Sequence, residues 1–278
     1  MLHIPYTESL MVKSKITVHM MVKNEDQWVR YSLLSVLPYV DTILVNDTGS
    51  TDHTVEAIKS ISSPKIKLTE YVVNTPSEVT RVREEQLRNT KTDWFWVVDG
   101  DEIYPEVTAQ EVVTTINGNN FEGITVRRYD LLGDIYHRQN ESVGTYKMWG
   151  TSGHLVLRAL NKNRIKGLHL SGSYPNEGYN DKNGIAIIDH DPTMHYITKN
   201  YLYHAMYLKR SSMGGNLNMF NRSKNKIELG IPLHSNPPTV FDIEPLSWER
   251  DPKQHRSPAY LTLASLITPI KQLKRKFI

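Results

Sequence analysis

The chain has 278 residues, of which 39% are hydrophobic and 23% charged, as in an ordinary globular protein of one large or two small domains. The formal net charge of +3 is small for this length and gives no general case for nucleic-acid binding. The absence of cysteine excludes disulfides, thiolate metal sites and cysteine nucleophiles. No segment holds the roughly 20 apolar residues of a spanning helix, and the first residues do not resemble a signal peptide. We therefore expect a cytoplasmic protein.

Apolar runs and helical spacings alternate over the first hundred residues. Strands are expected at 15–22, 42–45, 65–73 and 94–98. Helices are expected at 24–36, from the end of the polar turn 46–52 to about residue 61, and at 77–89. Strands and helices that alternate at these lengths indicate a parallel sheet with right-handed crossovers.

The second half is less regular. Helices are expected at 107–116 and 198–210, and strands at 123–129, 154–159, 185–190 and 194–197. Residues 211–257 are rich in Gly, Asn, Pro and Ser, which is typical of an irregular wrap or linker. A final apolar and basic segment covers 258–278.

Two aspartates, Asp99 and Asp101, follow the apolar run WFWVV with Gly100 between them. In an open α/β sheet the strand ends present the ligand groups. Alternate residues of an extended chain face one side, so both carboxylates can meet the same ligand, and glycine permits a close approach. Such carboxylates repel each other without a cation, and Mg²⁺ or Mn²⁺ prefers oxygen ligands and bridges to phosphate. The sequence therefore predicts a metal-assisted site for a phosphate-bearing substrate.

Three further polar residues lie next to these strands. Asp47, at the tip of the second expected strand, can accept hydrogen bonds from a nucleobase or ribose, or it belongs only to a capped βα turn. Arg83 can reach a pyrophosphate or stack on a base, or it lies on a solvated helix face. Glu25 can satisfy free amide groups at a helix start, and its place at a strand tip also allows a ligand role.

Four segments, taken in order, resemble the family 2 glycosyltransferases, whose nucleotide-sugar domain has the GT-A fold. They are MVKNE (21–25), SLLSVLPYVDTILVNDTGSTDHT (32–54), RVREEQL (81–87) and TDWFWVVDGDE (92–102), and HYITKNYLYHAMYLKR (195–210) is a weaker match. The resemblance is specific because four motifs agree in order and spacing.

The resemblance implies an α/β, Rossmann-like GT-A domain, with a mostly parallel central sheet flanked by helices, over residues 15–210. Its nucleotide-binding half would cover 15–102 and its acceptor half 103–210. Residues 1–14 would then form an N-terminal extension, and 211–278 an irregular C-terminal extension that ends in a basic amphipathic segment.

The resemblance also implies roles for single residues. Asp47 would contact the base or ribose of a nucleotide-sugar donor, with UDP as the expected nucleotide, and Arg83 would support the base. Asp99 would face the ribose or the metal. Asp101 would bind the metal that bridges the diphosphate, with His195 as a further ligand or as a half-buried histidine at a strand end. Such an ion would stabilise the negative charge that develops on the departing nucleoside diphosphate.

Inverting transfer also needs a carboxylate that deprotonates the acceptor hydroxyl. Related members often have an acid directly after a histidine, whereas His169 is followed here by Leu170. The nearest candidates are Glu177, which we take as the expected base, then Asp181 and Asp191, although acids in such loops and turns more often have no catalytic role.

The acceptor half holds several aromatic residues that fit a saccharide or glycolipid acceptor, although ordinary packing explains most of them. Trp149, in the Gly-flanked stretch KMWGTSGH, is the one to test. The C-terminal segment could contact an anionic membrane surface, pack on the core or form a dimer contact, and Pro269 favours packing because it weakens a continuous helix.

Two other functions compete with the transferase. A sugar-1-phosphate nucleotidyltransferase would show a Gly-rich, Arg-containing loop after the first strand, where this chain has MVKNEDQWVR. A nucleotide- or carbohydrate-binding protein without catalysis stays possible because no acid follows His169.

Overall fold

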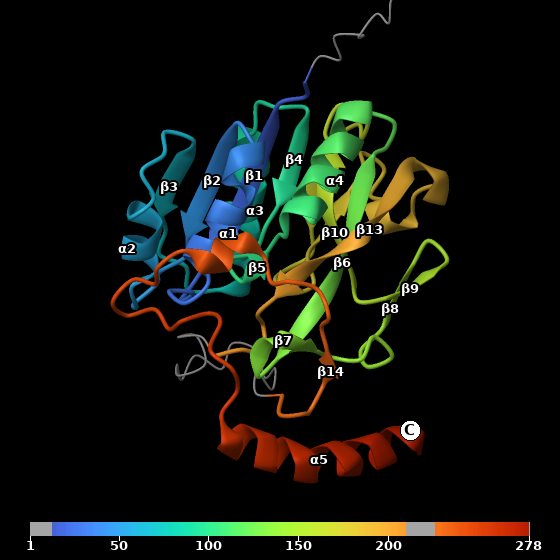
Figure 1. The fold of residues 1–278 in the computed structure, drawn as a ribbon. Helices are drawn as coiled ribbons and strands as arrows, with labels where there is room; N and C mark the ends of the chain where they lie inside the picture. Colours follow the sequence, from blue (N-terminus) through green and yellow to red (C-terminus); the bar gives the residue numbers. More distant parts are fainter. Residues whose placement is uncertain (1–12, 210–225, 278) are drawn as a thin grey trace, which may run out of the picture.

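The computed structural model describes residues 13–209 and 226–277. Within them a ten-stranded sheet runs in the order β14-β7-β6-β10-β4-β1-β2-β3, with β13 beside β6 and β5 beside β13 (Figure 1). The strands are β1 (Ile16–Val22), β2 (Thr42–Asp47), β3 (Ile66–Glu70), β4 (Trp94–Val97), β5 (Glu102–Ile103), β6 (Gly123–Leu132), β7 (Asp134–Arg138), β10 (Leu155–Asn161), β13 (His195–His204) and β14 (Ile231–Pro232). Two small hairpins lie outside the sheet, β8 (Tyr146–Met148) with β9 (Thr151–Gly153) and β11 (His169–Ser171) with β12 (Gly178–Asn180).

Helices connect and cover these strands. They are α1 (Val29–Val36), α2 (Thr54–Lys59), α3 (Pro76–Asn89), α4 (Glu106–Gly118) and α5 (Pro258–Lys276), together with the short 3₁₀ turns η1 (Leu37–Tyr39), η2 (Ile187–Asp189), η3 (Pro192–Met194) and η5 (Thr239–Asp242). The helix α3 begins at a capping box in which Thr75 accepts from the Glu78 amide.

The alternation of side chains along β1 and β4 builds two separate cores. Ile16, Val18 and Met20 of β1, with Trp94 and Trp96 of β4, face a large cluster completed by α1, α2 and α4. The residues between them face the other side, where α3 and the β11–β12 hairpin pack. Because side chains of both faces are buried, the carboxyl ends of these strands form the edge at which polar residues can gather.

The sheet is parallel from β3 to β4 and mixed beyond it. The strand β10 lies antiparallel to both β4 and β6, whereas β13 is parallel to β6. The α/β GT-A class is thus confirmed, while the sheet is mixed rather than mostly parallel because the second half adds its strands in both directions.

Several expectations for the second half are wrong. The predicted helix at 198–210 is strand through His204, because Tyr, Ile and Thr in HYITKNYLYH suit a pleated ladder against β6. The segment 185–190, expected as a strand, contains the turn η2. The last helix, α5, is continuous through Pro269.

The C-terminal part returns to the body of the protein. Phe241 packs with Trp28 and Tyr31, and Glu249 forms an ion pair with Arg30 at 3.0 Å, so this part covers the outer side of α1. The expectations for 1–12 and 211–225 lie outside the described residues. In the described ranges no helix is long and apolar enough to cross a membrane.

Candidate active site

The turn that follows β4 lies at the carboxyl edge of the sheet and carries Asp99, Gly100 and Asp101. A Cβ added at Gly100 would lie 2.8 Å from Cγ1 of Val22 and 3.4 Å from Cβ of Glu25. Glycine is therefore required because the turn passes directly against the end of β1. The same contact places Glu25 over this turn, as its strand-tip position suggested.

Hydrogen bonds from α1 hold the turn in place. The Ser32 hydroxyl donates to the backbone oxygen of Asp99 at 2.9 Å and of Glu102 at 2.7 Å. The Glu102 side chain is fully buried and accepts from the Asp99 amide at 3.3 Å. These bonds fix the backbone from which the acidic side chains project.

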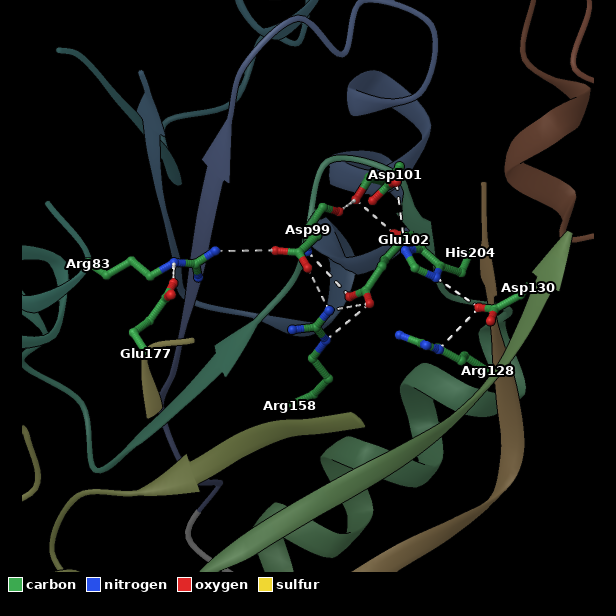
Figure 2. A network of polar contacts seen from close by, with 10 residues as sticks. Arg83, Asp99, Asp101, Glu102, Arg128, Asp130, Arg158, Glu177 and His204 are labelled. Carbon is green, nitrogen blue, oxygen red and sulfur yellow. Dashed lines mark hydrogen bonds and ion pairs between the residues drawn. The ribbon is translucent and has the colours of Figure 1, made fainter. Parts of the chain in front are cut away.

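Arg158 of β10 binds Asp99 of this turn and Glu102, the first residue of β5 (Figure 2). Its Nη2 lies 2.6 Å from Oδ2 of Asp99, and its Nε donates to Oε1 of Glu102 at 3.1 Å. Burial alone would raise the pKa of Asp99, but attraction to Arg158 and Arg83 outweighs burial and lowers it to about 2. For Glu102 burial prevails over Arg158 and raises the pKa. Asp99 is therefore ionised at neutral pH and forms an ion pair with the buried Arg158 guanidinium.

Arg83 joins the turn to the β11–β12 hairpin. Its Nη2 lies 3.9 Å from Oδ1 of Asp99, and its Nε lies 3.1 Å from Oε1 of Glu177. The hairpin docks on α3, where the Leu170 amide donates to the Glu84 carboxylate at 2.8 Å. The other oxygen of Glu177 is buried and has no hydrogen-bond partner among the residues described. Arg83 thus lies between Asp99 and Glu177, while Asp181 and Asp191 accept from amides of their own turns.

Asp101 faces the end of β13. Its backbone oxygen accepts from the Ala205 amide at 2.8 Å, and its buried carboxylate lies 3.7 Å from Nε2 of His204. The other ring nitrogen of His204 lies 2.9 Å from Asp130 of β6, which also pairs with Arg128 at 3.1 Å (Figure 2). Burial lowers the pKa of His204, but Asp101 and Asp130 outweigh burial and raise it.

Asp47 lies at the edge of the sheet, at the end of β2 beside Val22. Its side chain is buried and accepts from the amides of Gly49 at 3.0 Å and Ser50 at 2.9 Å, and from the Ser50 hydroxyl. These bonds close the βα turn, which is the simpler of the two roles considered for this residue. Contact with a base remains a prediction.

His195 is not brought to this cluster. Nine residue steps along β13, roughly 30 Å in an extended strand, separate it from His204. Its ring stacks on Trp149 at 3.9 Å, and burial lowers its pKa to about 4. The resemblance matched the first histidine of the segment 195–210, whereas the one next to Asp101 ends the strand.

The sequence reading missed Arg158, Glu102 and His204. A signal existed for the first, because a lone arginine in the apolar run LVLRALN requires an acidic partner once buried. A signal existed for His204 as well, since it ends the run YLYH much as Asp99 follows WFWVV. Glu102 offered no signal of its own.

A divalent cation fits between Asp101 and His204 in the chemistry of its donors. The Asp130 carboxylate orients His204 so that Nε2 points toward Asp101, as outer carboxylates do for metal-binding histidines. Across the described ranges no group of three His, Cys, Asp or Glu side chains forms a complete cage. Two protein ligands suit an ion whose remaining ligands are water and phosphate oxygens.

The fold and this edge define a GT-A protein whose acidic turn is flanked by arginines. A profile of the family described as Glycosyl transferase family 2 matches residues 17–172, more than half of the chain. The protein therefore belongs to the family 2 glycosyltransferases. No curated protein matches the sequence.

Solved structures provide more distant similarities. S. aureus TarS 1–349 is 14% identical with a TM-score of 0.44, covering 68% of this chain and 60% of that one. Its complex with UDP-GlcNAc is 15% identical with a TM-score of 0.45, covering 68% and 58%. Glucosyl-3-phosphoglycerate synthase from Mycobacterium tuberculosis, with Mn²⁺, UDP-glucose and phosphoglyceric acid, is 21% identical with a TM-score of 0.33, covering 40% and 42%. The match thus spans less than two thirds of these proteins.

Proposed function

We propose that the protein transfers a hexose from a UDP-linked donor to a saccharide or glycolipid acceptor, with inversion at the anomeric carbon. The observation that carries this proposal is that Arg83 of α3 joins Glu177 of the β11–β12 hairpin to Asp99, in the acidic turn that also carries Asp101. Family membership supports the class of reaction. The arginine provides positive charge toward a diphosphate or a π-face partner for a base.

The proposed metal ligands are Asp101 and His204. A divalent ion held there, Mn²⁺ or Mg²⁺, would supply positive charge to the departing nucleoside diphosphate. Asp99 would then serve the ribose rather than the ion, because Arg158 already occupies one of its oxygens. Asp47 and Glu25 are proposed to line the donor at the ends of β2 and β1.

Glu177 is the proposed base. One of its oxygens is paired with Arg83, and the other has no hydrogen-bond partner among the described residues. A glycolipid acceptor would also bring the protein to a membrane surface, with the basic C-terminal segment as the contact.

The first test measures thermal stability with UDP, GDP, CDP or ADP, each with Mn²⁺, Mg²⁺ or EDTA. A ligand at a hundred times its dissociation constant adds about 2.7 kcal/mol of stability, which gives an easily seen shift. Metal-dependent stabilisation by UDP that is lost in Asp101→Asn and retained in the turn variant Asp191→Asn would support the site. The absence of any shift with every nucleotide would overturn it.

The second test separates catalysis from binding. Glu177→Gln is expected to lower kcat by about 10²–10⁴-fold and leave UDP affinity unchanged if the residue is the base. A loss of UDP affinity instead would assign Glu177 to holding Arg83. A wild-type protein that binds UDP and never turns over any UDP-sugar would favour the non-catalytic binding protein.

A further inference from the structure

The helix α5 has one face fixed to the body of the protein. The Tyr260 hydroxyl donates to the backbone oxygen of Glu228 at 3.1 Å, and its ring fills the space over the β6–β7 turn, where a Cβ on Gly133 would lie 2.6 Å away. The Thr268 hydroxyl accepts from the Leu229 amide at 2.9 Å. Arg275 binds both oxygens of the Glu228 carboxylate, at 2.8 and 2.6 Å. These contacts fix the rotation of the helix about its own axis.

The opposite face is apolar and exposed. A stripe recurs at intervals of 4, 3, 4, 3 and 4 residues, made of Ala259, Leu263, Leu266, Ile270, Leu273 and Phe277. At about 100° per residue its centre lies about 140° from the centre of the anchored face. The exposed fractions are 65% for Leu266, 68% for Ile270 and 82% for Phe277. Figure 1 shows α5 set apart at one end of the molecule, below β7 and β14.

Charge decides what can cover this stripe. The helix α5 contains no acidic residue, and Lys271, Lys274, Arg275 and Lys276 lie close together near its end. Arg275 and Lys271 are near Glu228, whereas Lys274 and Lys276 form no ion pair with any residue in the described ranges. The spacing alone would also suit a helix–helix seam.

Pairing with a second copy of α5 conflicts with these charges. A parallel pair would place the two lysine-rich ends together. An antiparallel pair would place each of them over the start of the other helix, whose free amides carry partial positive charge. An anionic surface satisfies the lysines in either orientation of the protein on it.

We propose that α5 is a docking element for an anionic lipid surface. Its apolar stripe enters the boundary between headgroups and acyl chains, while Lys274 and Lys276 reach the headgroup phosphates. This surface is separate from the donor site, so the proposal does not depend on transferase activity. Docking would place the β7–β14 end of the body next to the membrane.

The experiment is co-sedimentation of the full chain with vesicles of phosphatidylcholine alone or mixed with phosphatidylglycerol. We expect binding to the mixed vesicles only, weakened by salt. Lys274→Glu/Lys276→Glu is expected to lose at least about twenty-fivefold in affinity, since each lysine near an anionic surface contributes roughly fivefold. Leu266→Ser/Ile270→Ser is expected to lose at least tenfold. Leu261→Ser and Lys199→Glu, on other faces, serve as matched controls.

Circular dichroism and UDP-dependent stability show whether each variant is folded and retains its donor site. Equal binding by the stripe variants and controls, or no binding to mixed vesicles, would overturn the proposal. A stripe-dependent dimer in light scattering with no vesicle binding would overturn it as well and would assign the seam to self-association.

Discussion

Replacing Arg158 by methionine removes the cation between Asp99 and Glu102 with little change in volume. Breaking a buried ion pair by removal of one partner costs about 3–5 kcal/mol, because the remaining charge stays buried. Glu102 is fully buried, so this full range applies to it, while the half-buried Asp99 adds less. At about 2–4 °C per kcal/mol for a chain of this size, the unfolding midpoint should fall by on the order of 10 °C.

The loss of folding stability in Arg158→Met should depend on pH in a definite direction. Burial already raises the pKa of Glu102, and Arg158 opposes that rise, so its removal raises the pKa further. A carboxyl with a higher pKa in the folded than in the unfolded state favours folding at low pH, and that stability is lost as pH rises through the folded value. The deficit of Arg158→Met should therefore be smaller near pH 5 than near pH 8.

Urea unfolding at both pH values measures this deficit. The double variant Arg158→Met/Glu102→Gln should recover much of the lost stability near pH 8, because it removes the orphaned charge. Arg88→Met, on the exposed side of α3, is the matched control and should stay within about 0.5 kcal/mol of wild type. A deficit under 1 kcal/mol, or one that is equal at the two pH values, would refute the assignment of Arg158 as the cation that balances this turn.

Three further predictions concern Gly100, Thr75 and His195. Gly100→Ala should lower stability by about 1–3 kcal/mol and weaken UDP binding, because its Cβ would lie 2.8 Å from Val22. The control Gly118→Ala has no contact under 3.6 Å and should be neutral. Thermal melting and UDP titration measure both variants. Thr75→Ala should cost about 1 kcal/mol through the α3 cap and Ser77→Ala less, and equal losses in urea unfolding would contradict the cap assignment. Burial lowers the pKa of His195 to about 4, so stability is lost as pH falls from the unfolded value toward 4; His195→Phe should flatten that part of the stability curve, and an unchanged acid profile would contradict it.

The first half of the fold was predictable because local signals and tertiary packing agree there. Runs such as KITVHMMV and WFWVV are β-rich and largely apolar, as expected of strands that are covered on both faces. The second half was less predictable because its strands pair with distant segments. The segment HYITKNYLYH was expected to be a helix from residue 198 on, but its ladder with β6 decides its structure, and no local pattern shows that partner.

The candidate site also has residues that the sequence could predict and residues that it could not. Asp99, Asp101, Arg83 and Asp47 lie in motifs that adjoin the parallel strands, so the common edge of those strands brings them near one another. Arg158 and His204 come from β10 and β13, whose positions depend on antiparallel and late pairings. His195 was expected instead of His204 because the sequence does not show which end of β13 lies next to Asp101.

The C-terminal helix shows why a visible period does not reveal which face is covered. Its apolar spacing can be read in the sequence, and packing of those residues on the core was the favoured expectation. The structure fixes the opposite face instead, because Glu228 pairs with Arg275 and the Leu229 amide needs the Thr268 hydroxyl. Ala264 and Thr268 are buried on that face, and the Tyr260 ring packs over Gly133 beside them. These local contacts, together with the ion pair, anchor the helix, so the apolar period alone does not show which face meets the body of the protein.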